Sequence, residues 1–233
     1  MTITDNEFDI SKISIADIAV TFPHAVEILS KYNLDYCCGG KKPFVKVCEK
    51  AGLNPELIWN EIESSRANRG MDNRMQFDLW DTSLLINFIE QHHHSYVRQS
   101  IPKIKELLNK VCSAHGEDSP FLIMVRDDFN EVAEELLNHM PKEEQVLFPA
   151  LRELQKGTTA PNLSAPISVM EHDHEQVGAL IKSIRTLTNN YTPPSYACPT
   201  FKVTYIMLDQ FDKDLMQHIH LENNILFPKA IGK

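Results

Sequence analysis

Two stretches of this chain repeat a spacing of residue types that bind metal ions. In "HMPKEEQVLFPAL" and "HIHLENNILFPKA", a histidine is followed four residues later by a glutamate and then by Leu-Phe-Pro. Residues four apart in a helix lie on the same face, so the histidine and glutamate of each stretch point the same way. The second stretch follows the first after 79 positions, which predicts two equivalent helices with matched ligands. These ligands are His139, Glu143, His218 and Glu222.

A single histidine precedes each of these pairs on a predicted helix of its own. His174 shares the apolar face of its helix, which turns the imidazole toward the bundle interior. The matching position in the first helix falls on the triplet at 92–94, where consecutive side chains point about 100° apart. The apolar residues after the triplet favour His94, whereas those before it favour His92. A second pairing, of His92 with His172, also fits the internal offset, so the spacing leaves both histidines open.

Four imidazoles and two carboxylates that converge inside a helical bundle require a cation between them. Buried carboxylates need partners, and two of them would repel each other without a positive charge. A structural zinc site takes four ligands and usually includes sulfur. Six nitrogen and oxygen donors from four helices suit two metal ions bridged by the carboxylates. Mixed imidazole and carboxylate ligands with open positions indicate iron or manganese.

The Leu-Phe-Pro that follows each pair has a structural explanation. We expect its leucine and phenylalanine in the core, where they seal the metal site. We expect its proline at a bend or an end of the helix, because proline cannot donate an α-helical hydrogen bond. The residues concerned are Leu147, Phe148, Pro149, Leu226, Phe227 and Pro228.

The elements that must position these ligands are helices. Glycine is scarce, and apolar residues recur at helical spacing, which predicts an all-α fold. Long helices with short polar connections are typical of an antiparallel four-helix bundle. We expect the bundle at 80–233, with its four helices over 81–112, 119–154, 166–189 and 199–230.

The first part of the chain predicts a small helical domain over 1–66, joined to the bundle by a polar linker over 67–79. Four short helices are indicated, with a break at Pro23 and with Asn54 as N-cap of the last one, before a proline at its first position. The "CCGG" stretch predicts a turn, because glycines permit positive φ.

Composition excludes several classes of function. The net charge is −9, which argues against a nucleic-acid partner, because such binding depends on Lys and Arg. No apolar run approaches the roughly 18–20 residues of a membrane span, and the start of the chain lacks the pattern of a secretory signal. Five cysteines without the density of a disulfide scaffold indicate a reducing compartment. We therefore expect a soluble, cytoplasmic protein.

The adjacent cysteines Cys37 and Cys38 are the other candidates for chemistry. A disulfide between neighbours closes a strained ring, so we expect two free thiols. An exposed pair on such a turn suits thiolate metal binding or redox exchange. The alternative is two small buried residues at a helix end. If the first interpretation holds, the pair could relay iron between the bundle and a soft acceptor.

At these residues the chain resembles the hemerythrin-like family of di-iron four-helix bundles. More narrowly, it resembles the iron–sulfur cluster repair proteins, whose ScdA-type N-terminal domain carries the cysteines. The resemblance covers nearly the whole chain and includes "FPHAVEILSKYNLDYCCGG" and "PISVMEHDHEQVG". It implies an oxo- and carboxylate-bridged centre of two iron ions in which Glu143 and Glu222 bridge. Pro102, which follows the triplet, sets the alignment in favour of His94. The implied ligands are His94, His139, Glu143, His174, His218 and Glu222.

The resemblance also implies a function. Such a protein repairs iron–sulfur clusters damaged by oxidative or nitrosative stress, with the damaged proteins as its clients and iron as what it supplies. Alternatives are a di-iron nitric oxide reductase or scavenger and an oxygen or nitric oxide sensor. Oxygen-carrying hemerythrins use five histidines, and the four found here open a position that favours iron delivery or gas chemistry over oxygen carriage.

Two further acids and the oligomeric state complete these expectations. Glu135 and Asp173 are candidate outer-shell acids or transient iron ligands, the alternative being ordinary solvated carboxylates on helices. The sequence does not determine the oligomer. It allows a homodimer that brings the cysteines of one subunit near the bundle of the other.

Overall fold

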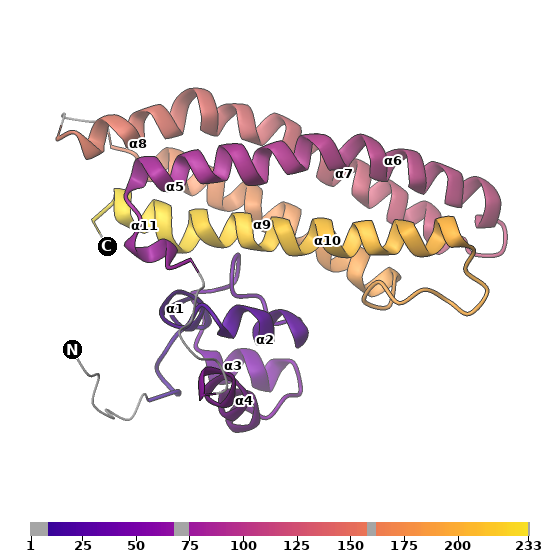
Figure 1. Ribbon diagram of the computed structural model, residues 1–233, viewed down its shortest axis with the longest axis horizontal. Helices are drawn as coiled ribbons and strands as arrows, with labels where there is room; N and C mark the ends of the chain where they lie inside the picture. Colours follow the sequence, from indigo (N-terminus) through magenta and orange to yellow (C-terminus); the bar gives the residue numbers. More distant parts are fainter. Residues whose placement is uncertain (1–8, 68–74, 158–161, 233) are drawn as a thin grey trace.

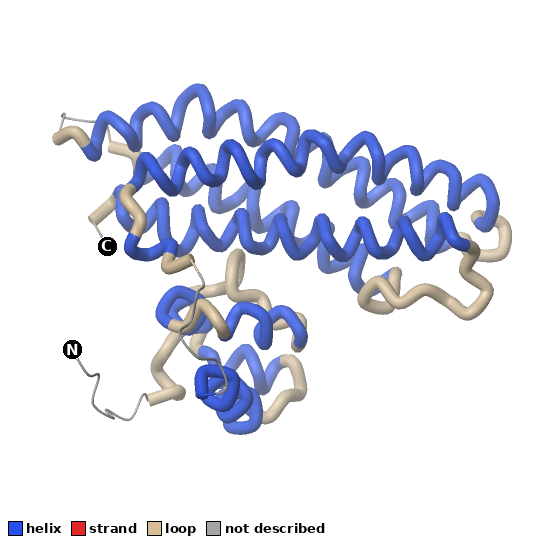
Figure 2. The backbone as a smooth tube through the Cα atoms, viewed as in Figure 1, coloured by secondary structure: helices blue, strands red, loops and turns tan. Residues whose placement is uncertain are grey.

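The protein is all-α, as its sequence predicts. The computed structural model describes residues 9–67, 75–157 and 162–232, and the regular elements in these ranges are helices (Figure 2). A four-helix bundle forms the larger part, and a group of short helices lies beside it (Figure 1). Within the described ranges, no helix combines the length and the apolar character that a membrane span requires.

Four rods make up the bundle, and their ends fall within a few residues of the predicted ones. The second rod packs against the first and third, and the fourth packs against the first. The first rod consists of α5 (Thr82–Phe88), η2 (Ile89–His94) and α6 (Ser95–His115). The second consists of α7 (Phe121–Lys142), η3 (Glu143–Leu147) and α8 (Phe148–Gln155). The third is α9 (Ser164–Leu187), and the fourth consists of α10 (Pro199–Leu221), η4 (Glu222–Leu226) and α11 (Phe227–Ala230).

Three rods contain a π-helical turn, namely η2, η3 and η4. A π turn carries a wider hydrogen-bonding pattern than an α-helix and is frequent at functional sites. His94 ends η2, while Glu143 and Glu222 begin η3 and η4. The π turns therefore occur where ligands were predicted, and they change the rotational phase of the helix on either side.

The repeated prolines directly follow two of these turns. Pro149 and Pro228 are each the second residue of the α-helix that resumes after the π turn. Of the two predicted positions, a bend or an end of the helix, Pro149 does not occupy an end, since its rod continues to Gln155. A proline cannot donate the α-helical hydrogen bond, and the preceding π turn is where that pattern is already interrupted.

Two apolar clusters lie on either side of the predicted ligands. The smaller one, which we call the end cluster, is formed by buried residues of α5, η2, η3, α8, the start of α9, and the segment from Leu221 to Phe227. The larger one, the main cluster, fills the rest of the bundle. The leucines and phenylalanines of both repeats are buried in the end cluster, which confirms the prediction that they are core residues: Leu147, Phe148, Leu226 and Phe227.

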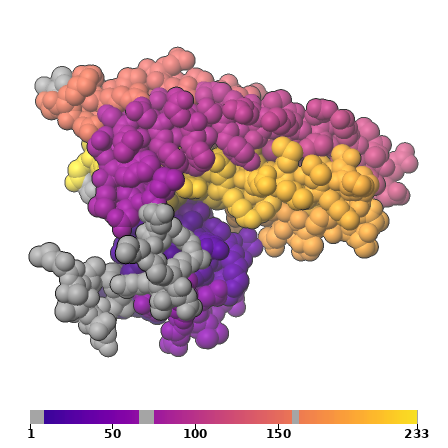
Figure 3. Space-filling model, in the orientation of Figure 1, coloured from indigo at the N-terminus to yellow at the C-terminus, as the bar shows by residue number. Residues whose placement is uncertain are grey.

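The N-terminal unit consists of four short helices, α1 (Ile15–Thr21), α2 (Ala25–Lys31), α3 (Phe44–Lys50) and α4 (Pro55–Ala67). Asn54 caps α4 as predicted, because its side-chain oxygen accepts the Glu56 N–H at 2.9 Å. The buried residues of this unit belong to the main cluster of the bundle, so the two parts share one core. The space-filling view shows the unit against the side of the bundle that α10 occupies (Figure 3).

The predicted linker is described only in part. Positions 68–74 lie outside the described residues, and the following segment contains the short 3-10 helix η1 (Phe77–Leu79). The turn after the cysteines does not use positive φ, contrary to expectation. Gly40 is instead required by close approach, because an added Cβ would lie 2.5 Å from the Tyr36 carbonyl oxygen.

Candidate metal centre

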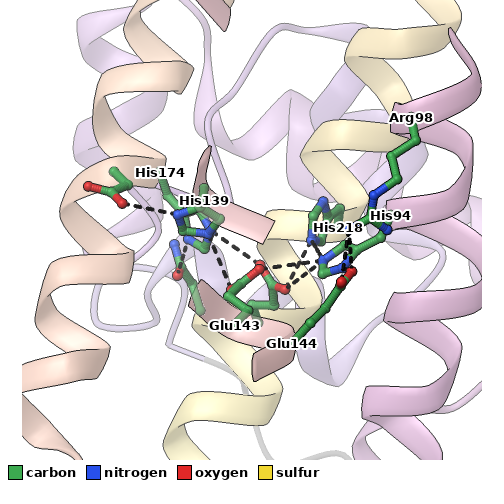
Figure 4. A network of polar contacts seen from close by, with 10 residues as sticks. His94, Arg98, His139, Glu143, Glu144, His174 and His218 are labelled. Atoms are coloured by element: carbon green, nitrogen blue, oxygen red, sulfur yellow. Dashed lines mark hydrogen bonds and ion pairs between the residues drawn. The ribbon is translucent and has the colours of Figure 1, made fainter. Parts of the chain in front are cut away.

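Six side chains from the four rods meet in one polar layer between the two apolar clusters. His94 and His218 form one half of this layer, and His139 and His174 form the other (Figure 4). Glu143 and Glu222 belong to both halves. None of the six side-chain positions is more than 2% exposed. The structure thus brings together all six ligands that the resemblance implies.

The two carboxylates lie where bridging ligands would lie. In each half the Nε2 atoms of the two imidazoles face each other, at 3.1 Å for His94 and His218 and 3.0 Å for His139 and His174. Each carboxylate reaches one imidazole of each half. The contacts to Nε2 are Glu143–His139 at 3.2 Å, Glu143–His94 at 3.4 Å, Glu222–His218 at 2.9 Å and Glu222–His174 at 3.2 Å.

The donor set fits two metal ions. Both side-chain oxygens of Glu143 and one of Glu222 are buried without a hydrogen-bond partner in the described part of the chain. A buried carboxylate in that state is costly, and two converging imidazole nitrogens are a ready pair of metal ligands. Imidazole and carboxylate without thiolate match iron or manganese and differ from a structural zinc site.

The phenylalanines of the repeated Leu-Phe-Pro cover the ligands on the side of the end cluster. The ring of Phe148 stacks on His94 with 5.9 Å between centroids, and Phe227 stacks on His174 with 6.3 Å. These two contacts are equivalent under the internal duplication. The repeated sequence therefore supplies two ligands and an apolar cover for a third, which excludes water and strengthens electrostatic interactions in the layer.

The charges in the layer decide which groups carry protons when no metal is bound. Burial alone would lower the pKa of His94, but Glu143 and Glu222 raise it to about 10. Burial also opposes the charged form of His139, yet the same carboxylates and Asp173 raise its pKa to about 9. Burial opposes ionisation of Glu222 too, but the surrounding histidines hold its pKa well below the ordinary value. Without metal, protonated His94 and His139 thus supply the positive charge that balances the two carboxylates.

Metal binding should therefore release protons. At pH 7, below the pKa values of about 10 for His94 and about 9 for His139, both rings are protonated in the metal-free protein. Because a metal binds only the neutral imidazole, we expect about two protons per chain to be released on anaerobic ferrous loading. The number should fall as the pH rises through 9 and 10. Calorimetry in buffers of different ionisation enthalpy measures it, and loading without proton release at pH 7 would contradict this charge distribution.

Three of the four imidazoles are oriented through their second nitrogen. The Nδ1 of His94 lies 2.6 Å from Glu144, which Arg98 also binds. The Nδ1 of His174 lies 2.9 Å from the side-chain oxygen of Asn223. Such outer partners fix the ring orientation and raise ligand basicity.

The two acids proposed for an outer role lie in different environments. Asp173 contacts His139 Nδ1 at 3.1 Å and pairs with Lys142 at the same distance, so it is placed to orient a ligand. Glu135 is half-buried, and no hydrogen bond or ion pair joins it to the ligands among the described residues. The geometry thus supports a ligand-orienting position for Asp173 and none for Glu135.

Glu144, Asn223 and Arg98 are site residues that sequence reasoning missed. Glu144 and Asn223 directly follow the bridging glutamates, and in a regular helix the next residue points about 100° away. The signal that could have found them is the duplication, because Glu144 and Asn223 occupy equivalent positions 79 residues apart. One half of the centre has an acid at this position, and the other half has an amide.

The histidine triplet is resolved by η2. His94 is buried in the centre and His92 is exposed, while His93 is fully buried and lies next to Asp214, with its Nδ1 3.0 Å from that carboxylate. The apolar residues before and after the triplet indicated different histidines because the π turn between them changes the helical phase.

The loop that carries Cys37 and Cys38, which we call the cysteine loop, lies directly against the polar layer. The Cys38 thiol donates to the backbone oxygen of His174 at 3.3 Å. The side-chain amide of Asn223 donates to the Cys37 oxygen at 3.4 Å, while its own oxygen faces His174. Gly178 permits this approach, because an added Cβ would lie 3.0 Å from the Cys38 sulfur. Asn223 therefore connects a predicted ligand to the N-terminal unit.

Both cysteines are free thiols, with 3.6 Å between their sulfur atoms. The expected exposure is wrong for Cys37, which is buried against Met216, whereas Cys38 is half-buried. The contact with Cys38, burial and the charge of Asp35 raise the pKa of Cys37 well above its usual value. Asp35, Cys37 and Cys38 also form a group with the spacing of metal ligands.

Comparison with known proteins gives consistent matches for both parts of the chain. The hemerythrin HHE cation-binding domain matches residues 85–230, and ScdA_N, described as a domain of unknown function, matches residues 11–66. A protein of Dickeya chrysanthemi named iron-sulfur cluster repair protein YtfE is 35% identical, over 94% of this chain and 96% of the relative. A protein of the same name from Yersinia pseudotuberculosis is 34% identical, with the same coverage of each chain.

Proposed function

This chain belongs to the hemerythrin HHE family, and from that premise we propose that it repairs damaged iron–sulfur clusters by supplying iron from a dinuclear centre. The curated relatives carry cluster repair in their names, and they match nearly the full length of this chain. The observation that carries the proposal is the contact between the cysteine loop and His174 at the edge of the metal layer.

The six ligands would hold two iron ions in the polar layer. When bound, iron supplies ferrous ions that can be passed on, together with open coordination positions. The two halves offer two imidazoles and two shared carboxylates each, which is too few donors to saturate either ion. The stacked phenylalanines and the end cluster keep water from the ligands on one side.

The cysteine loop offers a path outward on another side. Iron released from His174 would meet a second group of potential ligands, namely the thiols of Cys37 and Cys38 with the carboxylate of Asp35. The raised pKa keeps Cys37 protonated until a cation arrives, so binding would release its proton. Thiolates are also the ligands that hold iron–sulfur clusters. The pair would thus provide an intermediate binding site for iron between the imidazole–carboxylate site and a thiolate acceptor.

Removing both thiols should slow delivery without emptying the centre. We expect Cys37→Ala/Cys38→Ala to keep its iron but to lose at least about tenfold in the initial rate of transfer. The acceptor is a protein with a reduced three-iron cluster, which takes up one ferrous ion to become a four-iron cluster. Electron paramagnetic resonance and metal analysis follow the conversion. Cys198→Ala is the control, since Cys198 caps the far end of α10, about 30 Å of helix away.

Two outcomes would contradict parts of this proposal. If the double variant transferred iron at the wild-type rate, the role of the cysteines as a relay would be contradicted, but the donor function would not. If the wild-type protein kept its own iron and failed to convert the cluster, the donor function itself would be contradicted. Steady consumption of nitric oxide under those conditions would instead support a di-iron reductase that uses the open positions.

The same proposal extends to partners and setting. Damaged iron–sulfur proteins are the clients, nitric oxide or oxygen is the agent of damage, and free thiols suit the reducing cytoplasm. A homodimer is compatible with this scheme but not required by it, because the cysteine loop already contacts the bundle of its own chain.

A further inference from the structure

A second group of potential metal ligands lies just outside the dinuclear layer. His92, His93 and Asp214 place one ligand atom each within 4.8 Å of one another. His93 lies in η2 and is fully buried, and its Nδ1 is 3.0 Å from a carboxylate oxygen of Asp214 on α10. The exposed imidazole of His92 stands at right angles to that of His93, with 4.9 Å between ring centroids. The group therefore opens to solvent on the His92 side.

The buried atoms of this group are incompletely satisfied. The second oxygen of Asp214 and the Nε2 of His93 are buried without a hydrogen-bond partner in the described residues. In the same part of the chain, the only ion-pair partner of Asp214 is His93. A buried carboxylate oxygen without a partner is costly, and a cation held between Asp214 and the two imidazoles would satisfy it.

The other half of the duplicated bundle offers a comparison for these positions. There the equivalent residues are His172, Asp173 and Glu135. Asp173 turns inward and orients His139, and His172 contacts Gln176 instead. They form no such ligand group among the described residues.

In the first half a histidine replaces the inward acid. The ring of His93 stacks on that of His218, with 5.5 Å between centroids, but does not bond to His218 Nδ1, which has no hydrogen-bond partner in the described ranges. The first half thus has a histidine where the second half has an aspartate, and the contact that orients His139 has no counterpart at His218 among the described residues.

We propose that His92, His93 and Asp214 bind a third divalent transition-metal ion, on the solvent side of His218. Two imidazoles and one carboxylate suit borderline cations such as ferrous iron, cobalt or zinc. Three protein ligands leave the remaining positions to water, and the exposure of His92 makes the ion exchangeable. This site is separate from the dinuclear centre and does not depend on the repair function.

Cobalt titration of the iron-loaded full chain tests the site. We expect one cobalt ion per chain beyond the two iron ions, measured by equilibrium dialysis with elemental analysis. His92→Ala and Asp214→Asn should each weaken cobalt binding by at least about tenfold, because a direct ligand is lost. His172→Ala is the matched control, an exposed histidine at the equivalent position of the other half, and it should bind cobalt like the wild type.

Iron content, visible spectrum and circular dichroism show that the variants are folded and loaded. His92 is exposed, with its ring stacked on Phe88, so circular dichroism of His92→Ala shows whether the fold is kept even if Asp214→Asn perturbs the helix. The proposal is overturned if the wild type takes up no cobalt, if cobalt displaces iron, or if His92→Ala binds cobalt as tightly as His172→Ala does.

Discussion

Replacing Glu222 by glutamine should empty both halves of the proposed dinuclear centre. Glu222 contacts His218 in one half and His174 in the other, so its neutral isostere withdraws a charged ligand from each ion. We expect the iron content after reconstitution to fall from about two ions per chain to well below one. His139→Leu should lose about one ion, because His139 belongs to one half only.

Glu135→Gln is the matched control for this change. Glu135 lies one turn before His139, and its side chain makes no hydrogen bond or ion pair with the ligands in the described structure. The iron content of Glu135→Gln should therefore equal that of the wild type. Elemental analysis and the visible spectrum measure the iron content of each variant. Two iron ions in Glu222→Gln, or normal iron in His139→Leu, would be incompatible with shared bridging carboxylates and with the ligand assignment.

A second large effect is expected on stability, at the contact between α9 and α10. Arg185 binds both carboxylate oxygens of the buried Asp212, which Tyr191 also contacts at 2.8 Å. Arg185→Ala would leave that buried charge without its cation, which typically costs about 3–5 kcal/mol. For a protein of this size the unfolding midpoint should fall by about 10 °C. Thermal unfolding followed by circular dichroism measures the change.

Lys182→Ala provides the comparison on the same helix. Lys182 is exposed, so its removal should change the free energy of unfolding by about 0.5 kcal/mol or less. The double variant Arg185→Leu/Asp212→Leu should lose less than Arg185→Ala alone, because it leaves no unpaired charge behind. Equal losses in the single and double variants would show that packing, rather than the ion pair, explains the effect.

Much of this architecture could be predicted from residue spacing. The histidine and glutamate of each His-x-x-x-Glu pair share a face of a helix because they are four residues apart. The duplication also predicts His174 as a further ligand. The choice between His92 and His94 could not be made in this way. A π turn shifts the helical phase, and the apolar pattern does not indicate where such a turn occurs. The apolar stripes before and after it therefore indicate different histidines.

The position of the cysteine loop was also beyond sequence reasoning. It depends on contacts between segments more than one hundred residues apart, such as Cys38 with His174 and Cys37 with Asn223. Those contacts need the space left by Gly178 and the two-sided hydrogen bonding of an amide. An acid at 223, like Glu144 in the other half, could accept from His174 but could not donate to the loop.

The polar layer divides the apolar interior into two unequal parts. The end cluster beyond the ligands is held by short helical segments, while the main cluster is shared with the N-terminal unit. Unfolding of the tip therefore exposes fewer buried apolar residues than unfolding of the main cluster, and the larger part can stay intact while it happens. A local opening at this extremity would therefore uncover the ligand layer without taking the protein through a globally denatured state.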